Sequence, residues 1–386
     1  MMKANYPIEQ FQNIETPFYY YDLNVLRATL AEINQQIAGL PYVVHYAVKA
    51  NANNVILGEI NNAGLGADCV SGGEVQAAID AGIPASKVVF AGVGKADWEI
   101  KLGLENDIFC FNVESIPELE IIDGLAKSMG KTANIALRLN PNVQAHTHKH
   151  ITTGTNENKF GINLSELDKV TDVLNSMKNC NFYGIHFHIG SQITDLSDFR
   201  ELAVKTNEIQ EYFDNKKITL KHINVGGGLG VNYEHPNHFP TPDFEGYFRV
   251  WRKYMNLREG QIPHFELGRS IVAQCGSLVS RVLYVKEGQV KKFAILDAGF
   301  TDLIRPALYQ AYHRIENLSS NLPEEVYDVV GPICESSDTF AKDYTMNAAR
   351  RGDVIVLRTA GAYGEIMASQ YNLRKLPKAY YSPDFK

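Results

Sequence analysis

The chain lacks the patterns that mark several large classes of protein. Its five cysteines are odd in number, dispersed and without CxxC spacing, at Cys69, Cys110, Cys180, Cys275 and Cys334. This argues against a disulfide framework or a zinc site and indicates core thiols in a reducing compartment. No apolar run approaches the roughly 18 residues of a membrane span, and the first residues are polar where a signal peptide would be apolar. We therefore expect a cytoplasmic protein with no membrane partner.

Basic clusters are absent as well. The 386 residues include 37 Lys and Arg against 44 Asp and Glu, which gives a formal net charge of −7, and the basic residues are scattered. Nucleic acid is therefore not an expected partner. A hydrophobic content of 45% and a charged content of 21% are typical of a globular protein, and the length is sufficient for two domains.

The sequence does contain a regular alternation of short apolar runs and helical patterns. Eight runs predict buried strands, at residues 43–48, 67–70, 88–91, 108–112, 134–139, 182–188, 222–225 and 265–266. Helices are predicted at 24–38, 55–62, 74–81, 97–104, 117–128, 164–177, 196–213 and 244–256. Such an alternation indicates parallel βαβ units in a closed (β/α)8 barrel or an open doubly wound sheet. The count of eight favours the TIM-like barrel.

After about residue 273 the pattern changes. Segments 278–286, 292–297 and 353–357 are β-like, with turns between them and little helical period, which indicates a second, mostly-β domain. Segment 17–22 is also strand-like and is a candidate to pair with that domain. We therefore divide the chain into a barrel over 24–272 and a β-rich domain formed by 1–23 and 273–386.

Polar residues follow several predicted strands at their carboxyl ends, where such barrels carry their chemistry. Lys49 ends the first strand and is a candidate active-site amine, although a lysine there can also simply extend into solvent. His188 and Ser191 follow the sixth strand, where the imidazole could stack on a flat ligand and the hydroxyl could bind a phosphate. The alternative is a histidine that is satisfied by a neighbouring strand.

Two further motifs follow the last two strands. Gly226–Gly228 begins a glycine-rich run whose backbone N–H groups could surround an anion, or that forms only a tight turn. Glu266 ends the eighth strand, and a carboxylate inside a barrel is costly unless it has a partner. That partner could be a protonated pyridine nitrogen or the nearby Arg269.

The predicted second domain adds its own candidates. Arg305 precedes a proline, so we expect it in an extended or turn conformation, and its guanidinium suits a carboxylate. Cys334 has an acidic neighbour in Glu335, which is not the setting of a strong nucleophile, but the thiol could still give up a proton. Tyr363 lies between small residues and either approaches a ligand or marks a turn.

Three alternating histidines, His146, His148 and His150, would lie on one face of a strand and could form a metal site. No matching carboxylate pattern follows them, and the segment is typical of a loop. An exposed histidine loop is the favoured interpretation, and we expect no metal.

Taken in order, these motifs resemble the fold-type III decarboxylases that use pyridoxal 5′-phosphate. The segments are HYAVKAN, GADCVSGGE, ENKFGI, HFHIGSQ, GGGLG, FELGR, DAGF, DLIRPALY, GPICESSD and GAYG, and the likeness runs from Pro17 to about Asn372. The resemblance implies a barrel with a β-rich domain, like that of alanine racemase and ornithine decarboxylase. It also implies a homodimer in which the partner subunit contributes Cys334 and Glu335. Leu267 stands where the family usually has proline, which restores a backbone N–H beside the phosphate loop.

The resemblance also assigns roles to individual residues. The cofactor would be held by Lys49 through its amine, by His188, Glu266 and Asp68, and at its phosphate by Ser191, Gly227, Gly228, Gly268, Arg269 and Tyr363. The substrate would contact Arg269, Arg305, Tyr309, Glu335 and Tyr363. Cys334 or Lys49 would return a proton to the α-carbon.

The implied reaction is the decarboxylation of meso-2,6-diaminopimelate to L-lysine and CO₂. The second carboxylate of this substrate requires a fixed cation, which Arg269 and Arg305 could supply, and its distal ammonium requires an acid such as Glu335. An ornithine or lysine decarboxylase would need no arginine there. The alternatives are a related decarboxylase acting on carboxynorspermidine or another amino acid, and a catalytically silent homologue that only binds the cofactor.

Overall fold

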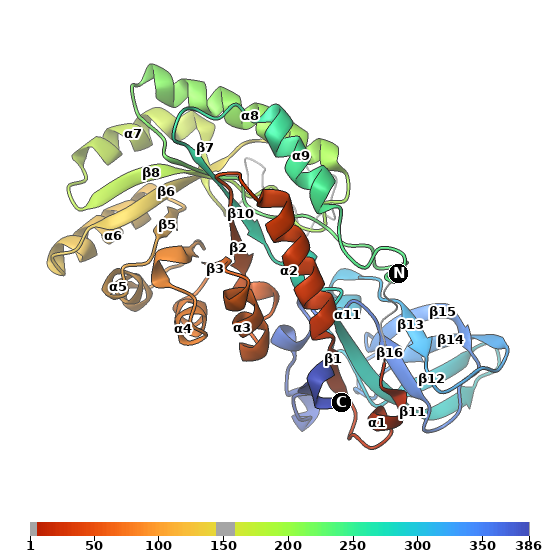
Figure 1. The fold of residues 1–386 in the computed structure, drawn as a ribbon. Helices are drawn as coiled ribbons and strands as arrows, with labels where there is room; N and C mark the ends of the chain where they lie inside the picture. Colours follow the sequence, from red (N-terminus) through yellow and green to blue (C-terminus); the bar gives the residue numbers. More distant parts are fainter. Residues whose placement is uncertain (1–5, 144–158, 386) are drawn as a thin grey trace. The chain divides into compact units, whose positions relative to one another are not determined.

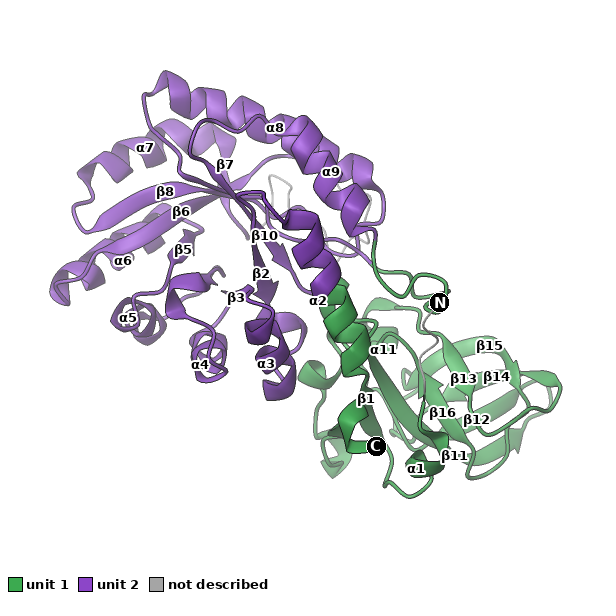
Figure 2. Ribbon diagram, viewed as in Figure 1, with its two compact units in different colours: residues 1–29, 231–242, 269–386 green, residues 30–230, 243–268 purple. Residues whose placement is uncertain are grey.

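The computed structural model describes residues 6–143 and 159–385, and it divides into two compact units. Unit 1 consists of Met1–Thr29, Val231–Pro242 and Arg269–Lys386, and unit 2 consists of Leu30–Gly230 and Asp243–Gly268 (Figure 2). Residues 231–242 lie within the predicted barrel range along the sequence, yet they belong to unit 1.

Unit 2 is built around a closed ring of eight parallel strands (Figure 1). Their order is β5 (Cys110–Val113), β4 (Val88–Phe90), β3 (Gly66–Cys69), β2 (Val43–Ala47), β10 (Ile262–Leu267), β9 (His222–Asn224), β8 (Cys180–His186) and β6 (Ala133–Asn140). Pairing of β5 with β6 closes the ring, and a short β7 (Ile162–Asn163) pairs with β6 outside it. The predicted barrel is confirmed, and each predicted run overlaps one of its strands.

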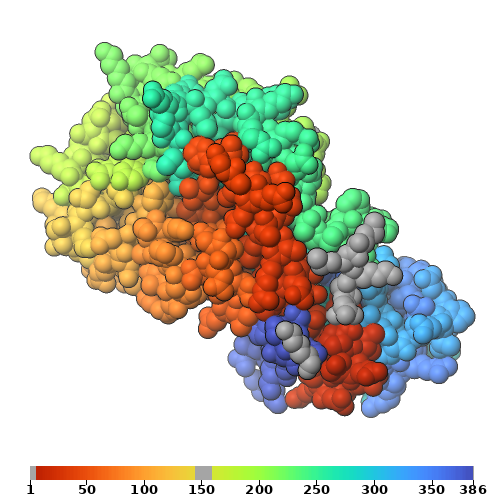
Figure 3. Space-filling view, viewed as in Figure 1, coloured from red at the N-terminus to blue at the C-terminus, as the bar shows by residue number. Residues whose placement is uncertain are grey.

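Helices alternate with these strands along the chain. They are α2 (Leu23–Ile37), α3 (Asn54–Asn62), α4 (Gly72–Asp80), α5 (Asp97–Glu105), α6 (Ile116–Ser128), α7 (Leu167–Ser176), α8 (Leu196–Asn215) and α9 (Phe244–Tyr254). Asn53, Ser71, Ser115 and Asp195 cap four of them by accepting a backbone hydrogen bond from the first turn. The red-orange end of α2 lies beside the teal α9 in the space-filling view (Figure 3), where Arg252 donates to the Gln36 carbonyl at 3.3 Å.

The interior of the barrel contains a row of polar side chains. His45 of β2, His264 of β10 and His222 of β9 form a hydrogen-bonded row, with N–N distances of 2.8 and 2.7 Å. His45 Nδ1 lies 3.1 Å from the Lys87 carbonyl, which can only accept, so this nitrogen carries the proton. His45 then accepts at Nε2 from His264 Nδ1–H, and His264 accepts at Nε2 from His222 Nδ1–H, so the row is formed by neutral imidazoles.

Unit 1 is a sheet of eight strands. The central order is β13 (Ile315–Asn317), β16 (Val354–Leu357), β11 (Gly276–Glu287), β12 (Lys292–Leu296), β14 (Glu324–Val330) and β15 (Thr339–Asn347). β1 (Phe18–Tyr21) pairs with β11 and with β17 (Lys378–Tyr381), so the predicted pairing of segment 17–22 with the second domain is confirmed. The short helices are α1 (Ile8–Phe11), α10 (Arg269–Val272) and α11 (Arg305–Tyr309).

The expected conformation of Arg305 is wrong. Instead of an extended segment or turn, Arg305 is the first residue of α11, and Pro306 lies in the first turn. Proline is tolerated there because it lacks only an N–H group that has no partner inside the helix.

Membrane-spanning helices, metal sites and disulfides were not expected from the sequence. In the parts of the chain that the structure describes, no helix has both the length and the apolar character that a bilayer crossing requires. Within the same ranges, no cluster of three or more His, Cys, Asp or Glu side chains has a metal-binding arrangement. His146, His148 and His150 lie outside the described residues. All five cysteines are free; Cys69, Cys110 and Cys275 are buried, and Cys334 is exposed.

Candidate active site

Lys49 lies at the carboxyl end of β2, in a short 3₁₀ turn over Val48–Ala50. Its ammonium donates a 2.8 Å hydrogen bond to Asp68 Oδ2 on the adjacent strand β3. The Asp68 side chain is fully buried, whereas that of Lys49 is 34% exposed. Burial and the charge of Glu266 raise the pKa of Asp68 to about 6, against the lowering effect of Lys49. The pair therefore presents an accessible amine that is anchored on a buried carboxylate.

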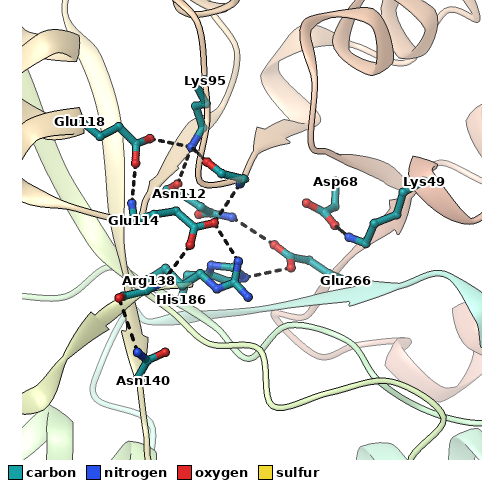
Figure 4. A network of polar contacts seen from close by, with 12 residues as sticks. Lys49, Asp68, Lys95, Asn112, Glu114, Glu118, Arg138, Asn140, His186 and Glu266 are labelled. Carbon is teal, nitrogen blue, oxygen red and sulfur yellow. Dashed lines mark hydrogen bonds and ion pairs between the residues drawn. The ribbon is translucent and has the colours of Figure 1, made fainter. Parts of the chain in front are cut away.

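Glu266 projects from β10 into the barrel, where three side chains donate to it (Figure 4). Its Oε1 accepts from Asn112 at 3.1 Å and from Asn224 at 2.7 Å, and its Oε2 lies 2.9 Å from His186 Nε2. Burial alone would raise the pKa of Glu266, but the charge and hydrogen bond of His186 outweigh it and hold the pKa below its usual range. The carboxylate therefore stays charged and is able to keep a basic ring nitrogen protonated.

His188 follows His186 by two residues, just after β8. Its Nδ1 accepts a 3.5 Å hydrogen bond from the backbone N–H of Gly227. Burial, reinforced by the charges of Arg138 and Lys49, lowers its pKa well below the usual value, so the imidazole is neutral. A neutral, half-buried ring at the mouth of the barrel is suited to stacking on a flat aromatic ligand.

The glycine run after β9 is required by close packing. A Cβ on Gly227 would overlap the carbonyl oxygen of Glu266, and Gly228 has φ +106°, which side chains rarely adopt. The backbone N–H of Ile193 donates to Gly228 at 2.9 Å, which joins this run to the loop that carries Ser191. The two loops are thus held together at the carboxyl end of the barrel, where barrels of this class usually bind phosphate.

A buried ion-pair network supports the same end of the barrel (Figure 4). Glu114, just after β5, accepts from Arg138 of β6 at 2.8 Å and from the N–H groups of Gly92 and Gly161 at 2.9 Å each. The Lys95 ammonium donates to the carbonyls of Gly92 and Asn112 and to Glu118 Oε1, at 2.9, 2.9 and 2.6 Å. The loops that follow β4 and β5 are thus fixed by charged groups removed from water.

Unit 1 brings together the arginines and tyrosines that the sequence singled out. Arg269 donates to the Tyr233 hydroxyl at 2.7 Å, and its guanidinium lies 4.8 Å from the centre of the Tyr363 ring. The Arg305 guanidinium lies 5.0 Å from the centre of the Tyr233 ring. Tyr309 ends α11, one turn after Arg305. Two buried cations that lie against the same tyrosine suit an anionic ligand.

Cys334 and Glu335 are exposed on unit 1. The backbone N–H of Cys334 donates to Asn372 Oδ1 at 3.3 Å, and Tyr371 donates to Glu335 Oε1 at 2.8 Å. Both side chains are therefore accessible, and Glu335 is oriented by a neighbouring hydroxyl.

Sequence reasoning missed several of these contacts. His186 carried a weak signal, because residues two apart on a strand point to the same side and His188 was already a candidate. Asn112, Asn224 and Tyr233 carried no local signal, and neither did His313, whose Nε2 lies 2.8 Å from Arg305 Nη1. Nothing in the sequence around these residues distinguishes them from ordinary polar or aromatic residues.

The residues of unit 2 fit pyridoxal phosphate. The charged, buried Glu266 suits a protonated pyridine nitrogen, the neutral His188 suits the ring face, and the close-packed glycine run lies where such barrels bind phosphate. Asp68 Oδ1 and His186 Nδ1 are buried without a hydrogen-bond partner in the described structure, so polar capacity remains in the barrel for a ligand.

Residues 23–273 match the family model of the pyridoxal-dependent decarboxylases, pyridoxal binding domain. The chain belongs to this family of pyridoxal-dependent enzymes. Within it, the chain is 62% identical over 384 residues to the diaminopimelate decarboxylase of Bacteroides thetaiotaomicron, covering 99% of this chain and 100% of that protein. The particular branch is therefore that of the diaminopimelate decarboxylases.

Solved structures agree with this assignment. Diaminopimelate decarboxylase from Helicobacter pylori, complexed with L-lysine, superimposes with a TM-score of 0.90 at 40% identity, covering 96% of this chain and 93% of that one. The enzyme from M. jannaschii in complex with L-lysine gives a TM-score of 0.87 at 35% identity, covering 97% and 89%.

Proposed function

We propose that this protein decarboxylates meso-2,6-diaminopimelate to L-lysine and CO₂. The observation that carries the proposal is the pair of buried arginines, Arg269 and Arg305, around Tyr233 in unit 1. An amino acid such as ornithine has a single carboxylate, which leaves as CO₂, so an enzyme acting on it has no second carboxylate to bind. Two buried guanidiniums match the distal carboxylate of diaminopimelate.

The cofactor-binding roles follow from the contacts in unit 2. Lys49 supplies the amine that binds the cofactor covalently, and Asp68 orients that amine through the 2.8 Å contact. His188 stacks on the ring, and Glu266 keeps the ring nitrogen protonated. Ser191, Gly227, Gly228, the backbone of Gly268 and Arg269, and the Tyr363 hydroxyl hold the phosphate. When bound, pyridoxal phosphate accepts the electron pair that remains at the α-carbon after CO₂ departs.

The substrate-binding roles follow from unit 1. Arg269, Arg305 and Tyr309 bind the distal carboxylate, and Glu335 accepts from the distal ammonium. Tyr363 contacts the substrate from its place over the Arg269 guanidinium. Cys334 donates the proton that replaces CO₂ at the α-carbon, with Lys49 as the competing donor.

The accessible Cys334 and Glu335 support a further part of the proposal, namely a homodimer in which each subunit supplies these residues to the site of the other. The five free cysteines support action in the reducing cytoplasm. Both parts rest on the resemblance to the family and on side chains that are open to contact.

A substrate panel tests the proposal. Release of CO₂ is measured from meso-diaminopimelate, L-lysine and L-ornithine with the wild type and with Arg305→Met. Meso-diaminopimelate should be the preferred substrate, and the variant should lose at least about tenfold in kcat/KM with it, because a charge-assisted contact is lost. Activity with L-ornithine and none with diaminopimelate contradicts the proposal. Arg249→Met, at an exposed position on α9, is the matched control and should behave as the wild type.

A further inference from the structure

We propose that Tyr233 and His313 are positioning residues that hold Arg269 and Arg305 as a clamp for the distal carboxylate of the substrate. The inference rests on the proposed function, because it concerns the carboxylate that separates diaminopimelate from simple diamine precursors. Neither residue needs to contact the reacting atoms, since each acts through a guanidinium.

Tyr233 contacts both arginines in different ways. Its hydroxyl accepts from Arg269 at 2.7 Å, and its ring lies 5.0 Å from the Arg305 guanidinium. The two guanidinium charges repel each other. The electron-rich phenol offsets this repulsion, because its oxygen contacts Arg269 and its ring face contacts Arg305. Burial would raise the pKa of Tyr233, but the two arginines outweigh burial and lower it.

His313 fixes the other side of Arg305. Its Nδ1 lies 2.8 Å from the Arg358 carbonyl, and its Nε2 lies 2.8 Å from Arg305 Nη1. A carbonyl only accepts and a guanidinium only donates, so Nδ1 carries the proton and Nε2 is the acceptor. Burial, followed by the charge of Arg305, lowers the pKa of His313 to about 3, which keeps the imidazole neutral.

These partners leave the charge of Arg305 available to a ligand. Arg305 is buried, and within the described ranges it contacts the neutral imidazole and the tyrosine and forms no ion pair with a carboxylate. A buried cation with neutral partners is stabilised when an anion arrives. A carboxylate suits it by shape, because the planar fork of arginine can donate twice. A ligand that lacks this carboxylate would gain nothing from the clamp.

Tyr233 owes its position to contacts within unit 1. It lies in Val231–Pro242, which follows β9 in sequence but belongs to unit 1. Arg358 Nη2 donates to Asn237 Oδ1 at 3.0 Å, and Arg314 Nη1 donates to the Glu234 carbonyl at 3.3 Å. This loop carries the phenol to the two arginines and is tied there at two points.

Binding calorimetry on the holoenzyme tests the inference with two probes. L-lysine carries the carboxylate, and cadaverine is the same diamine chain without it. Tyr233→Phe keeps the ring beneath Arg305 but loses the acceptor for Arg269, so it should weaken L-lysine binding about tenfold. Tyr233→Leu removes both contacts and should weaken binding further, by about a hundredfold. Cadaverine affinity should stay within about threefold of wild type, since no carboxylate contact is involved.

Two variants of His313 test whether its hydrogen bonds position Arg305. His313→Gln can still donate to the Arg358 carbonyl and accept from Arg305, and should keep L-lysine affinity within about threefold of wild type. His313→Leu should lose about tenfold in L-lysine affinity. The KM for diaminopimelate should rise in parallel with these losses, while kcat changes less. Visible absorbance of the bound cofactor verifies that each variant is folded and loaded.

Several outcomes would overturn the inference. Unchanged L-lysine affinity in Tyr233→Leu contradicts it, and so does an equal loss of L-lysine and cadaverine affinity, which would indicate a merely structural role. Should Tyr233→Leu fail to fold, Tyr233→Phe and the His313 pair decide. A wild-type enzyme that forms no lysine from diaminopimelate removes the proposed function and this inference together. A wild-type enzyme that forms lysine, combined with indifferent variants, contradicts the inference alone.

Discussion

At the scale of residues, the charged groups of the candidate site differ in how deeply they are buried. Lys49 is partly exposed and rests on the fully buried Asp68. Glu266 is buried among donors that stabilise its charge, so its environment matches that of an acid facing a protonated ring nitrogen. The chemistry follows from these environments, because the same carboxyl group without donors would be neutral in the barrel.

Lys49→Ala should abolish both cofactor attachment and turnover. The amine is the covalent anchor in the proposed function, so the visible absorbance of the bound cofactor should disappear and CO₂ release should fall by more than about a thousandfold. Lys101→Ala, at an exposed lysine of α5, should change neither. Retained absorbance and activity in Lys49→Ala would contradict the role given to this residue.

Glu266→Gln should keep the fold but lose the charge. Glutamine has the same shape, yet it cannot stabilise a proton on the ring nitrogen, so kcat should fall by about a hundredfold or more. Steady-state kinetics and the cofactor spectrum give the readout, and Glu211→Gln on the exposed face of α8 is the matched control. A kcat within a few fold of wild type would mean that the cofactor does not rely on this carboxylate.

The placement of Lys49, His188 and Glu266 at the carboxyl ends of barrel strands was predictable from sequence, because each ends or follows an apolar run; their roles remain predictions. The contacts of His186, Asn112 and Asn224 with Glu266 were not predictable, because these residues lie inside strands and meet Glu266 only when the barrel closes. The conformation of Arg305 was predicted wrongly, because the rule for residues before proline gave way to the start of a helix.

At the scale of elements, the histidine row across β2, β10 and β9 makes the barrel sensitive to acid. The pKa values of His45 and His222 are lowered to about 4, in both cases chiefly by burial. In the unfolded chain these groups titrate near 6.5, so below that pH the unfolded state binds protons first and stability falls until about pH 4. For the buried His45 alone, the loss amounts to about 3 kcal/mol.

Urea unfolding at pH 7.5 and pH 5 measures this effect. The wild type should lose stability on acidification, and His45→Gln, which cannot take up a proton there, should lose less. His238→Gln, at an exposed histidine, should follow the wild type. Equal losses in all three proteins would show that the row does not govern acid stability.

Glu114 joins three elements, and its removal should be costly. Glu114→Ala would leave Arg138 buried without its ion-pair partner and would free the N–H groups of Gly92 and Gly161. Loss of one partner of a buried pair costs about 3–5 kcal/mol in the free energy of unfolding. Thermal or urea unfolding measures it, with Glu120→Ala on the exposed side of α6 as control. A cost below about 1 kcal/mol would indicate that water replaces the missing group.

The elements themselves were largely predictable. Eight apolar runs with helical patterns between them predicted the strand count, because each run is short and each helical pattern is long enough for one crossover. What sequence could not give is the assignment of residues 231–242 to unit 1, because long-range contacts of Asn237 and Glu234 decide it.

At the scale of the whole molecule, the chain combines a pyridoxal-binding barrel with a β-rich unit that contains the two arginines proposed to bind the distal carboxylate. In the proposed dimer each copy supplies Cys334 and Glu335 to the site of the other, so activity would require the dimer.

Co-expression of Lys49→Ala with Cys334→Ala tests this. Each variant alone should be nearly inactive. A mixed dimer has one site with both native residues and one with neither, so a random mixture, in which about half of the dimers are mixed, should recover about a quarter of wild-type activity. No recovery would mean that each subunit supplies its own Cys334.

The central claim is most directly tested by the product of the wild-type enzyme. Purified protein loaded with pyridoxal phosphate is incubated with meso-diaminopimelate, and CO₂ and lysine are quantified with chiral separation. The account predicts L-lysine and CO₂ in equal amounts, with no comparable turnover of L-ornithine. Absence of lysine, or CO₂ released only from an amino acid without a distal carboxylate, would contradict it.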